Sequence, residues 1–110
     1  MHRTLIVARL EPDRRPDVAA AFAESDRTEL PRLVGVRARS LFTFHGLYLH
    51  LIETDRDPTP VLRDLHHHPL FADVNAKLGR HVTAYHPDWH EPADAMAQQF
   101  YHWSRDGDAR

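Results

Sequence analysis

Residues 35–55 read GVRARSLFTFHGLYLHLIETD, and this stretch decides the fold of the chain. Two runs rich in aliphatic, aromatic and β-branched residues flank His45 and Gly46, a pattern typical of a β-hairpin with a two-residue turn. If those two residues form the whole loop, counting outward places Leu41 opposite His50. The register of the two strands is therefore predicted along their whole length.

Alternation sorts the side chains of this hairpin into two faces. One face is almost wholly apolar and consists of Ala38, Ser40, Phe42, Phe44, Leu47, Leu49 and Leu51. The other face adds polar and basic groups and consists of Arg37, Arg39, Leu41, Thr43, Tyr48, His50 and Ile52. Both faces need a cover, and a chain of 110 residues supplies one layer of helices. We therefore expect the second cover to be another copy of the chain.

The second face places Arg39 and His50 diagonally, with their backbones roughly 7–8 Å apart. A buried arginine or histidine is costly unless it is paired or put to use. Two interpretations follow from the residues alone. Either Arg39 pairs with a carboxylate and His50 is a satisfied core histidine, or the two side chains form a functional site.

The segments on either side of the hairpin complete a repeating pattern. We expect a strand over 3–10, a helix running to about residue 27, a short linker over 28–34, a second helix from about residue 61 that Pro69 interrupts and Gly79 ends, and a strand over 80–86. With the hairpin, the order is strand, helix, strand, strand, helix, strand. This order predicts an α+β, ferredoxin-like βαββαβ fold, with an antiparallel sheet covered by helices on one face.

The segment 95–103, AMAQQFYHW, fits a fifth strand or a short amphipathic helix. We favour the strand, because Phe100, Tyr101 and Trp103 are strand-favouring aromatic residues. Residues 1–104 are expected to form a single domain, and the charged residues 105–110 a frayed tail.

Asp26 ends the apolar face of the first helix, since it follows Val18 and Phe22 at a spacing near 3.6 residues. In one interpretation Asp26 simply begins the next loop, where aspartate is common. In the other, its carboxylate points toward the sheet beside apolar groups and is a better base than a free aspartate.

Composition excludes several classes of function. The formal net charge is −2 and the arginines are dispersed among carboxylates, so nucleic acid is not expected as a partner. The chain has no cysteine, which excludes disulfides and thiolate chemistry and fits a reducing cytoplasm. No apolar run approaches a membrane span or a signal segment, so we expect a cytoplasmic protein without membrane contact.

Neither metal nor nucleotide is expected as a cofactor. His66, His67 and His68 are consecutive, so on a helix they point in different directions, which favours a solvated run over a metal site. Neither a glycine-rich phosphate loop nor a nucleophile elbow is present in the sequence. A cofactor-free enzyme or a binding module remains.

The chain resembles the small aromatic polyketide cyclases of the tetracenomycin type. The matching runs are AAAFAESDRTELP, GVRARSLFTFHGLYLHLIE, HPLFADVN and the terminal FYHW, which together span nearly the whole chain in register. The resemblance implies a homodimer of the dimeric α/β barrel type, with a pocket between helices and sheet in each subunit. It also implies an enzyme that closes and aromatises a late ring of a polyketide by aldol condensation and loss of water, in bacterial antibiotic or pigment biosynthesis.

The resemblance also implies roles for particular residues. Asp26, Arg39 and His50 fall on positions that line the family's pocket and are the expected catalytic residues. Arg39 would stabilise an enolate and His50 would carry protons near neutral pH, while Asp26 would orient His50 or act as the base. The expected substrate-binding residues are Phe22, Ser25, Leu41 and Tyr48. Ser25 stands where the family has a histidine, which puts a mechanism with two histidines in doubt.

Two rival functions share the expected pocket. Cofactor-free monooxygenases that oxidise anthrones are built on the same dimeric barrel. A non-catalytic subunit that binds a polyketide is the other alternative. For each of these functions the partners are an aromatic polyketide, a second copy of the chain and, weakly, a polyketide synthase.

Overall fold

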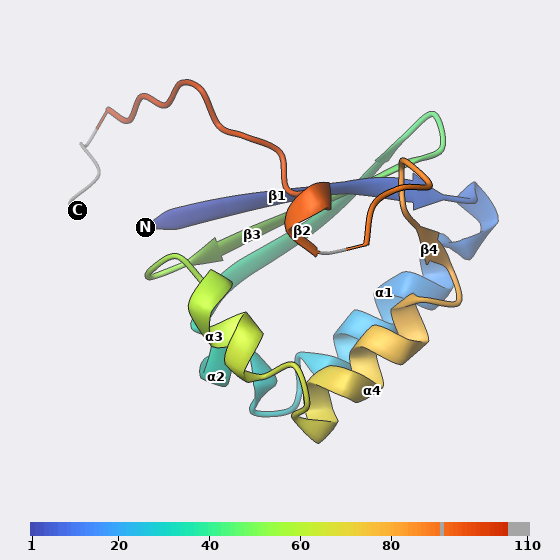
Figure 1. Cartoon of the computed structure of the whole chain (residues 1–110), viewed down its shortest axis with the longest axis horizontal. Helices are drawn as coiled ribbons and strands as arrows, with labels where there is room; N and C mark the ends of the chain where they lie inside the picture. Colours follow the sequence, from blue (N-terminus) through green and yellow to red (C-terminus); the bar gives the residue numbers. More distant parts are fainter. Residues whose placement is uncertain (91, 106–110) are drawn as a thin grey trace.

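The protein is described here from a computed structural model, which covers residues 1–90 and 92–105. In this part of the chain one antiparallel sheet has the strand order β2-β3-β1-β4, and the α-helices lie on one side of it (Figure 1). The strands are β1 His2–Leu10, β2 Val36–Phe44, β3 Leu47–Thr54 and β4 Val82–Thr83. The helices are α1 Arg15–Ser25, α2 Leu30–Val34, α3 Thr59–Asp64 and α4 Pro69–Leu78, with 3₁₀ turns η1 Pro12–Arg14 and η2 Pro92–Ala95. The predicted ferredoxin-like α+β fold is confirmed.

The central hairpin has the predicted turn and register. His45 and Gly46 have φ angles of 48° and 79°, the left-handed values that a two-residue hairpin turn needs at both positions. Leu41 pairs with His50, and the counted pairing holds to the turn. A register shift between Val36 and Ala38 marks an irregularity at the far end of the hairpin.

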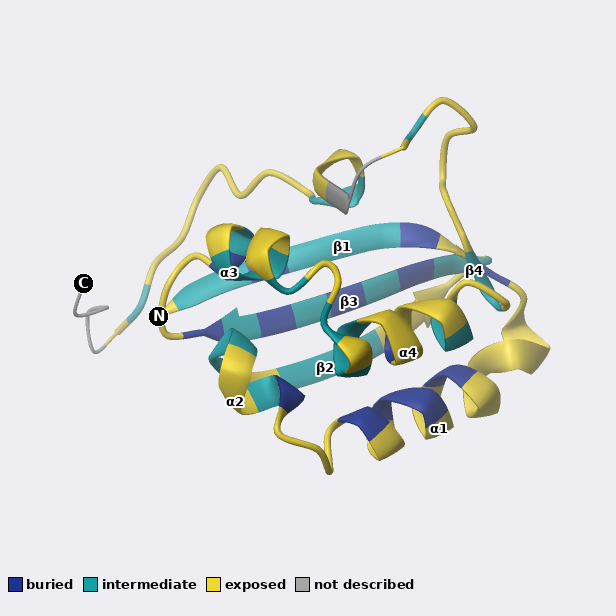
Figure 2. Cartoon of the chain, turned by 60° about the horizontal axis from the view of Figure 1, so that its bottom comes forward, coloured by how far each residue is buried: buried dark blue, intermediate teal, exposed yellow. Residues whose placement is uncertain are grey.

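Helix α1 buries the face that the sequence predicts, including Val18 and Phe22 (Figure 2). These side chains meet Tyr48 of β3 in the core. The buried core cluster consists of Ala8, Leu10, Val18, Phe22, Leu30, Tyr48 and Val74. The core therefore lies between α1, α4 and the helix-facing side of the sheet.

The second helical region is interrupted before Pro69, as predicted. Helix α3 ends at Asp64 and α4 begins at Pro69, with Gly79 as the C-cap of α4. The ring Nδ1 of His68 accepts a hydrogen bond of 3.1 Å from the backbone N–H of Leu70. His68 is thus the N-cap of α4, a role that the sequence pattern did not reveal.

The strand expected over 80–86 is much shorter than predicted, since β4 comprises only Val82–Thr83. Arg9 explains where it stops. Its Nε donates to the carbonyl oxygen of Tyr85 at 3.1 Å, and its guanidinium lies 4.3 Å from the centre of the Tyr85 ring. The Arg9 side chain therefore hydrogen-bonds the Tyr85 carbonyl oxygen, which a longer β4 would use in its backbone hydrogen bonds to β1.

The fifth strand expected over 95–103 was a wrong prediction. Met96 forms one isolated bridge with Ile6 of β1, and no strand follows between residues 97 and 105. Phe100, Tyr101 and Trp103 are 97%, 76% and 68% exposed, so the aromatic side chains that favoured a strand bury little against the described chain. Without that burial, edge pairing alone does not hold a strand. Of the predicted frayed tail, residues 106–110 lie outside the described residues.

The apolar face of the hairpin turns away from the helices. Phe42 and Phe44 are 56% and 61% exposed, whereas Tyr48 and His50 on the opposite face are each 4% exposed. The apolar packing partner expected for this face is not supplied by the described part of the chain. None of the helices in residues 1–90 and 92–105 has the length and hydrophobicity of a membrane span.

Candidate active site

Arg39 of β2 and Asp26 at the C-cap of α1 form a two-pronged ion pair. The Nη2 of Arg39 donates to Oδ1 of Asp26 at 2.8 Å, and Nε donates to Oδ2 at 3.1 Å. The side chain of Arg39 is 15% exposed and that of Asp26 39%. This bidentate geometry fixes the plane of the guanidinium and ties the end of α1 to the sheet.

The third arm of the guanidinium reaches His50. The Nη1 of Arg39 lies 3.0 Å from Nε2 of His50, and Nδ1 of His50 lies 3.0 Å from the hydroxyl oxygen of Tyr48. Arginine can only donate, so Nε2 must accept, and the proton of the neutral imidazole sits on Nδ1. Nδ1 therefore donates to Tyr48, which leaves the hydroxyl hydrogen of Tyr48 free for another acceptor.

Burial sets the charge state of this network. Burial, and secondarily the positive charge of Arg39, lower the pKa of His50 from 6.5 to about 3. Burial also raises the pKa of Tyr48, against a smaller opposing effect of Arg39. Burial thus favours the neutral form of His50 in the resting site, and its role in carrying protons near neutral pH stays a prediction.

Phe22 of α1 supplies an aromatic wall beside these polar groups. The guanidinium carbon of Arg39 lies 4.5 Å from the centre of the Phe22 ring, and the ring of His50 meets Phe22 edge to face at 4.9 Å. A cation over an aromatic face is favourable, particularly when it is shielded from water. Phe22 thus holds Arg39 and His50 in place while keeping the site partly dry.

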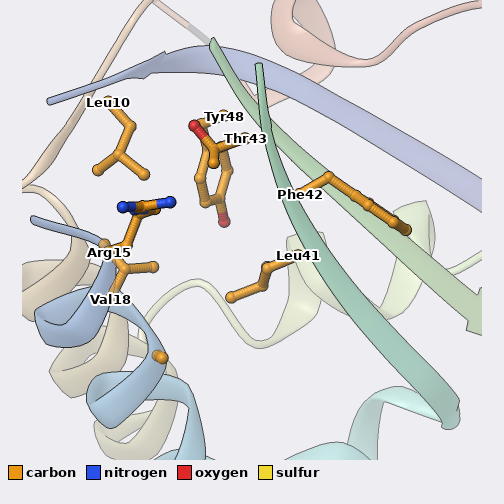
Figure 3. A pocket seen from close by; sticks show the side chains of 8 residues that line it. Leu10, Arg15, Val18, Leu41, Phe42, Thr43 and Tyr48 are labelled. Atoms are coloured by element: carbon orange, nitrogen blue, oxygen red, sulfur yellow. The ribbon is translucent and has the colours of Figure 1, made fainter. Parts of the chain in front are cut away.

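A cavity of about 170 Å³ adjoins this cluster, between α1 and β2 (Figure 3). Its lining residues are Leu10, Arg15, Val18, Ala19, Leu41, Phe42, Thr43 and Tyr48. Tyr48 belongs both to the cavity wall and to the hydrogen-bonded network, so it connects the two. The cavity and the network together form the candidate site.

The structure brings together most of the residues selected from the sequence. Asp26, Arg39 and His50 are linked, Phe22 packs against them, and Leu41 and Tyr48 line the cavity. Asp26 contacts Arg39 rather than His50, so any orientation of His50 by Asp26 passes through the arginine. Ser25 is buried at the end of α1, where its carbonyl accepts from the Thr28 hydroxyl, and it is not part of the cavity lining.

Sequence reasoning missed Arg15 and Val18 as lining residues of the cavity. The signal was present, because Arg15 precedes Phe22 by seven positions and Asp26 by eleven. These spacings put all three on one side of a helix. No group of three potential metal ligands is found among the described residues.

The fold and site define a small α+β protein whose curved sheet and helices enclose an arginine–histidine cluster beside an apolar cavity. The description "Polyketide synthesis cyclase" belongs to the family model that matches residues 2–104. The chain belongs to this family. Cyclase function is therefore favoured over the monooxygenase and the non-catalytic binding subunit.

Individual relatives agree with this assignment. Tetracenomycin F2 cyclase from Streptomyces glaucescens is 50% identical over 103 residues, which is 94% of each chain. Polyketide synthase CurG from Streptomyces cyaneus is 47% identical over 107 residues, covering 96% of this chain and all of the relative. The solved structure of tetracenomycin F2 cyclase, described as a type-II polyketide cyclase, matches with a TM-score of 0.90 at 49% identity, covering 94% of this chain and 98% of that one.

Proposed function

We propose that this cyclase closes a late ring of a partly cyclised aromatic polyketide by intramolecular aldol condensation, and then aromatises the ring by loss of water. The observation that carries the proposal is the position of Arg39, whose guanidinium bridges Asp26 and His50 beside the cavity. The proposed chemistry is that of a lyase and needs neither metal nor nucleotide. Its setting would be bacterial antibiotic or pigment biosynthesis in the cytoplasm.

The first step removes a proton from a carbon that lies between two carbonyl groups. Arg39 is the electrophilic group of the proposal, because it stays protonated and its donors can meet the negative charge that develops on the enolate oxygen. The enolate carbon then attacks a second carbonyl carbon, which forms the ring bond and leaves an alkoxide. The alkoxide takes up a proton, and loss of a second carbon-bound proton with the hydroxyl group releases water.

Nε2 of His50 is the proposed base. In the resting site its lone pair accepts from Arg39, so it becomes available when a substrate oxygen takes over the Nη1 donor of the arginine. Burial is the larger cause of the low pKa of His50, and partial neutralisation of Arg39 by the enolate weakens the smaller one, the repulsion by the guanidinium. His50 would thus gain basicity as the enolate forms. Asp26 is the alternative base, and it otherwise holds Arg39 in place.

The remaining residues would orient the substrate. The hydroxyl of Tyr48 receives a hydrogen bond from His50, so its own hydrogen is available to a substrate carbonyl in the cavity. Phe22 and Leu41 offer apolar walls to a flat molecule, and Ser25 is a further proposed contact at its outer edge. Holding the chain folded lowers the entropic barrier of ring closure.

The proposal includes a homodimer formed through the outer face of the sheet. Phe42 and Phe44 lie exposed on that face, and a second copy would bury them. Residues 1–104 are proposed to fold as one domain in each subunit. A weak association with the polyketide synthase would pass the intermediate to the cyclase.

Turnover without oxygen tests the proposal against the monooxygenase alternative. Purified protein is incubated with a partly cyclised polyketide in an oxygen-free cuvette, and the absorbance of the newly aromatic ring is followed. We expect the same rate with and without oxygen, and with and without a chelator. A reaction that stops without oxygen would overturn the cyclase proposal, and ligand binding without any turnover would favour a binding subunit.

A further inference from the structure

Arg15 contributes a cationic group to the cavity wall. It is the first residue of α1, and Figure 3 shows its guanidinium among the lining side chains Leu10, Val18 and Tyr48. Its Nε donates to the carbonyl oxygen of Pro12 at 2.8 Å, which fixes the direction of the side chain. Within residues 1–90 and 92–105 no carboxylate forms an ion pair with it, so the two terminal nitrogens are available to a ligand.

The rest of the cavity is largely apolar. Leu10, Val18 and Leu41 form its walls, while Thr43 and Tyr48 are the other polar side chains that line it. Apolar walls with a few fixed polar groups are typical of sites that bind an apolar ligand in one orientation. A guanidinium in such a wall favours a carboxylate, because its planar donors match both carboxylate oxygens.

The two arginines of the site differ in charge compensation. Arg39 is already neutralised by Asp26, with contacts of 2.8 and 3.1 Å, whereas Arg15 has no such carboxylate in the described chain. A negatively charged group on the ligand therefore gains more at Arg15 than at Arg39. Electrostatics would select one of the two end-to-end orientations of the ligand.

The distance between Arg15, at the start of α1, and the Asp26–Arg39 pair, at its end, suits an elongated ligand. Asp26 follows Arg15 by eleven residues, and a helical rise of 1.5 Å per residue separates their backbones by about 16 Å along α1. The cavity beside Arg15 measures about 170 Å³, below the ~300–1,000 Å³ of pockets that enclose a whole ligand. It therefore accommodates one end of a fused-ring molecule, while the other end reaches Arg39 and His50.

We propose that Arg15 forms a carboxylate subsite, which binds the acid end of a fused-ring polyketide and directs the opposite end toward Arg39. This inference rests on the proposed function and specifies its substrate class as a polyketide carrying a free carboxylate. Arg15 is a positioning residue in this arrangement. It touches the substrate far from the reacting carbons and decides which ring reaches them.

Binding of a simple probe tests the subsite without turnover. Anthracene carboxylate and its neutral carboxamide are titrated against the purified full-length protein by fluorescence. We expect the wild type to prefer the carboxylate by about twofold to fivefold, as for an exposed charge pair, and the preference to shrink as salt is added. Arg15→Gln should bind the two probes equally. Arg15→Lys should keep part of the preference, because it keeps the charge.

Arg14→Gln is the matched control, since Arg14 is an exposed neighbouring arginine outside the cavity lining and should leave the preference unchanged. Equal binding of both probes by the wild type, or an undiminished preference in Arg15→Gln, would overturn the subsite. The cyclisation assay distinguishes a failure of the subsite from a failure of the proposed function. In that assay Arg15→Gln should raise KM for a carboxylate substrate severalfold while kcat changes little.

Discussion

Arg39 donates a hydrogen bond of 3.0 Å to Nε2 of His50, so the histidine meets the arginine with its lone pair and carries its proton on Nδ1, toward Tyr48. The same guanidinium donates hydrogen bonds to both carboxylate oxygens of Asp26 through Nε and Nη2. One arginine thus sets both the tautomer of the histidine and the position of the carboxylate. The three residues should respond to substitution as a unit and not as independent contributors.

Replacement of Arg39 separates its charge from its geometry. Arg39→Ala should lower kcat/KM by about 10²–10³-fold, the usual loss for an electrostatic donor at a developing oxyanion. Arg39→Lys should lose less, because lysine keeps the charge but not the planar fork. Steady-state kinetics measure both, and thermal melts identify a variant that has merely unfolded. Equal rates for Arg39→Lys and Arg39→Ala would show that the charge at this position contributes nothing.

Replacement of His50 should remove proton transfer. His50→Ala is expected to lower turnover by about 10²–10⁴-fold. A folded His50→Ala variant with the kcat of the wild type would mean that His50 is only a core histidine. The comparable variant His45→Ala changes an exposed histidine in the hairpin turn and should turn over normally.

Stability should fall with acidification because His50 is held neutral. The pKa of His50 is about 3 in the folded chain and 6.5 before folding, so below pH 6.5 the unfolded chain binds a proton that the folded chain does not. The full contribution is present above pH 6.5 and is lost as the pH falls toward 3. By pH 5 the wild type should lose roughly 2 kcal/mol from this group.

Denaturant unfolding at pH 7 and pH 5 measures this effect. The reference is His50→Gln, which cannot titrate and should lose roughly 2 kcal/mol less than the wild type over the same interval. Carboxylates titrate mainly below pH 5 and cancel in the comparison. Parallel pH dependence in the two proteins would mean that His50 protonates normally in the folded state.

Asp26→Asn distinguishes two roles for the carboxylate. Asparagine keeps the shape and one acceptor but removes the charge, so a mild loss of turnover indicates orientation of Arg39 and a severe loss indicates a base. We expect the mild loss, because both carboxylate oxygens accept from Arg39. Stability should decrease by about 1–2 kcal/mol, less than for a fully buried pair, because the Asp26 side chain is 39% exposed.

The outer sheet face should hold two subunits together. Light scattering at micromolar concentration should give the mass of a dimer for the wild type and a monomer for Phe42→Glu, since a charge there opposes burial. Leu33→Glu is the control, because Leu33 is 39% exposed on the helical side of the molecule. A wild-type protein that is monomeric in this measurement would contradict the dimer.

The hairpin and the site could be predicted because they depend on local periodicity. A two-residue turn fixes the register, the register fixes which side chains share a face, and Arg39 and His50 are then neighbours by counting. Asp26 could be added to this pair because the helical period places Phe22 and Asp26 on the same side of the first helix. The proximity of these three residues followed from the sequence, whereas the direct contact of Asp26 with Arg39 rather than with His50 did not.

Other features depended on tertiary contacts that no local pattern contains. The strand predicted over 80–86 is shorter because Arg9 contacts Tyr85. The aromatic residues after Met96 form no strand because they stay exposed. The low pKa of His50 could not be predicted, because the extent of burial, which is its larger cause, depends on the tertiary packing of α1 against the sheet. The helical spacing places Arg15 on the side of Phe22 and Asp26, but the cavity beside it exists only once β2 and β3 are packed against α1.

The mass of the product shows whether the protein closes a ring with loss of water. A partly cyclised polyketide carrying a free carboxylate is incubated with the wild type and with Arg39→Ala, and the products are compared by mass spectrometry. We expect the wild type to form a product lighter than the substrate by one water, with no oxygen gained, and Arg39→Ala to form it far more slowly. A product that has gained oxygen, or a substrate that the folded wild type leaves unchanged, would contradict it.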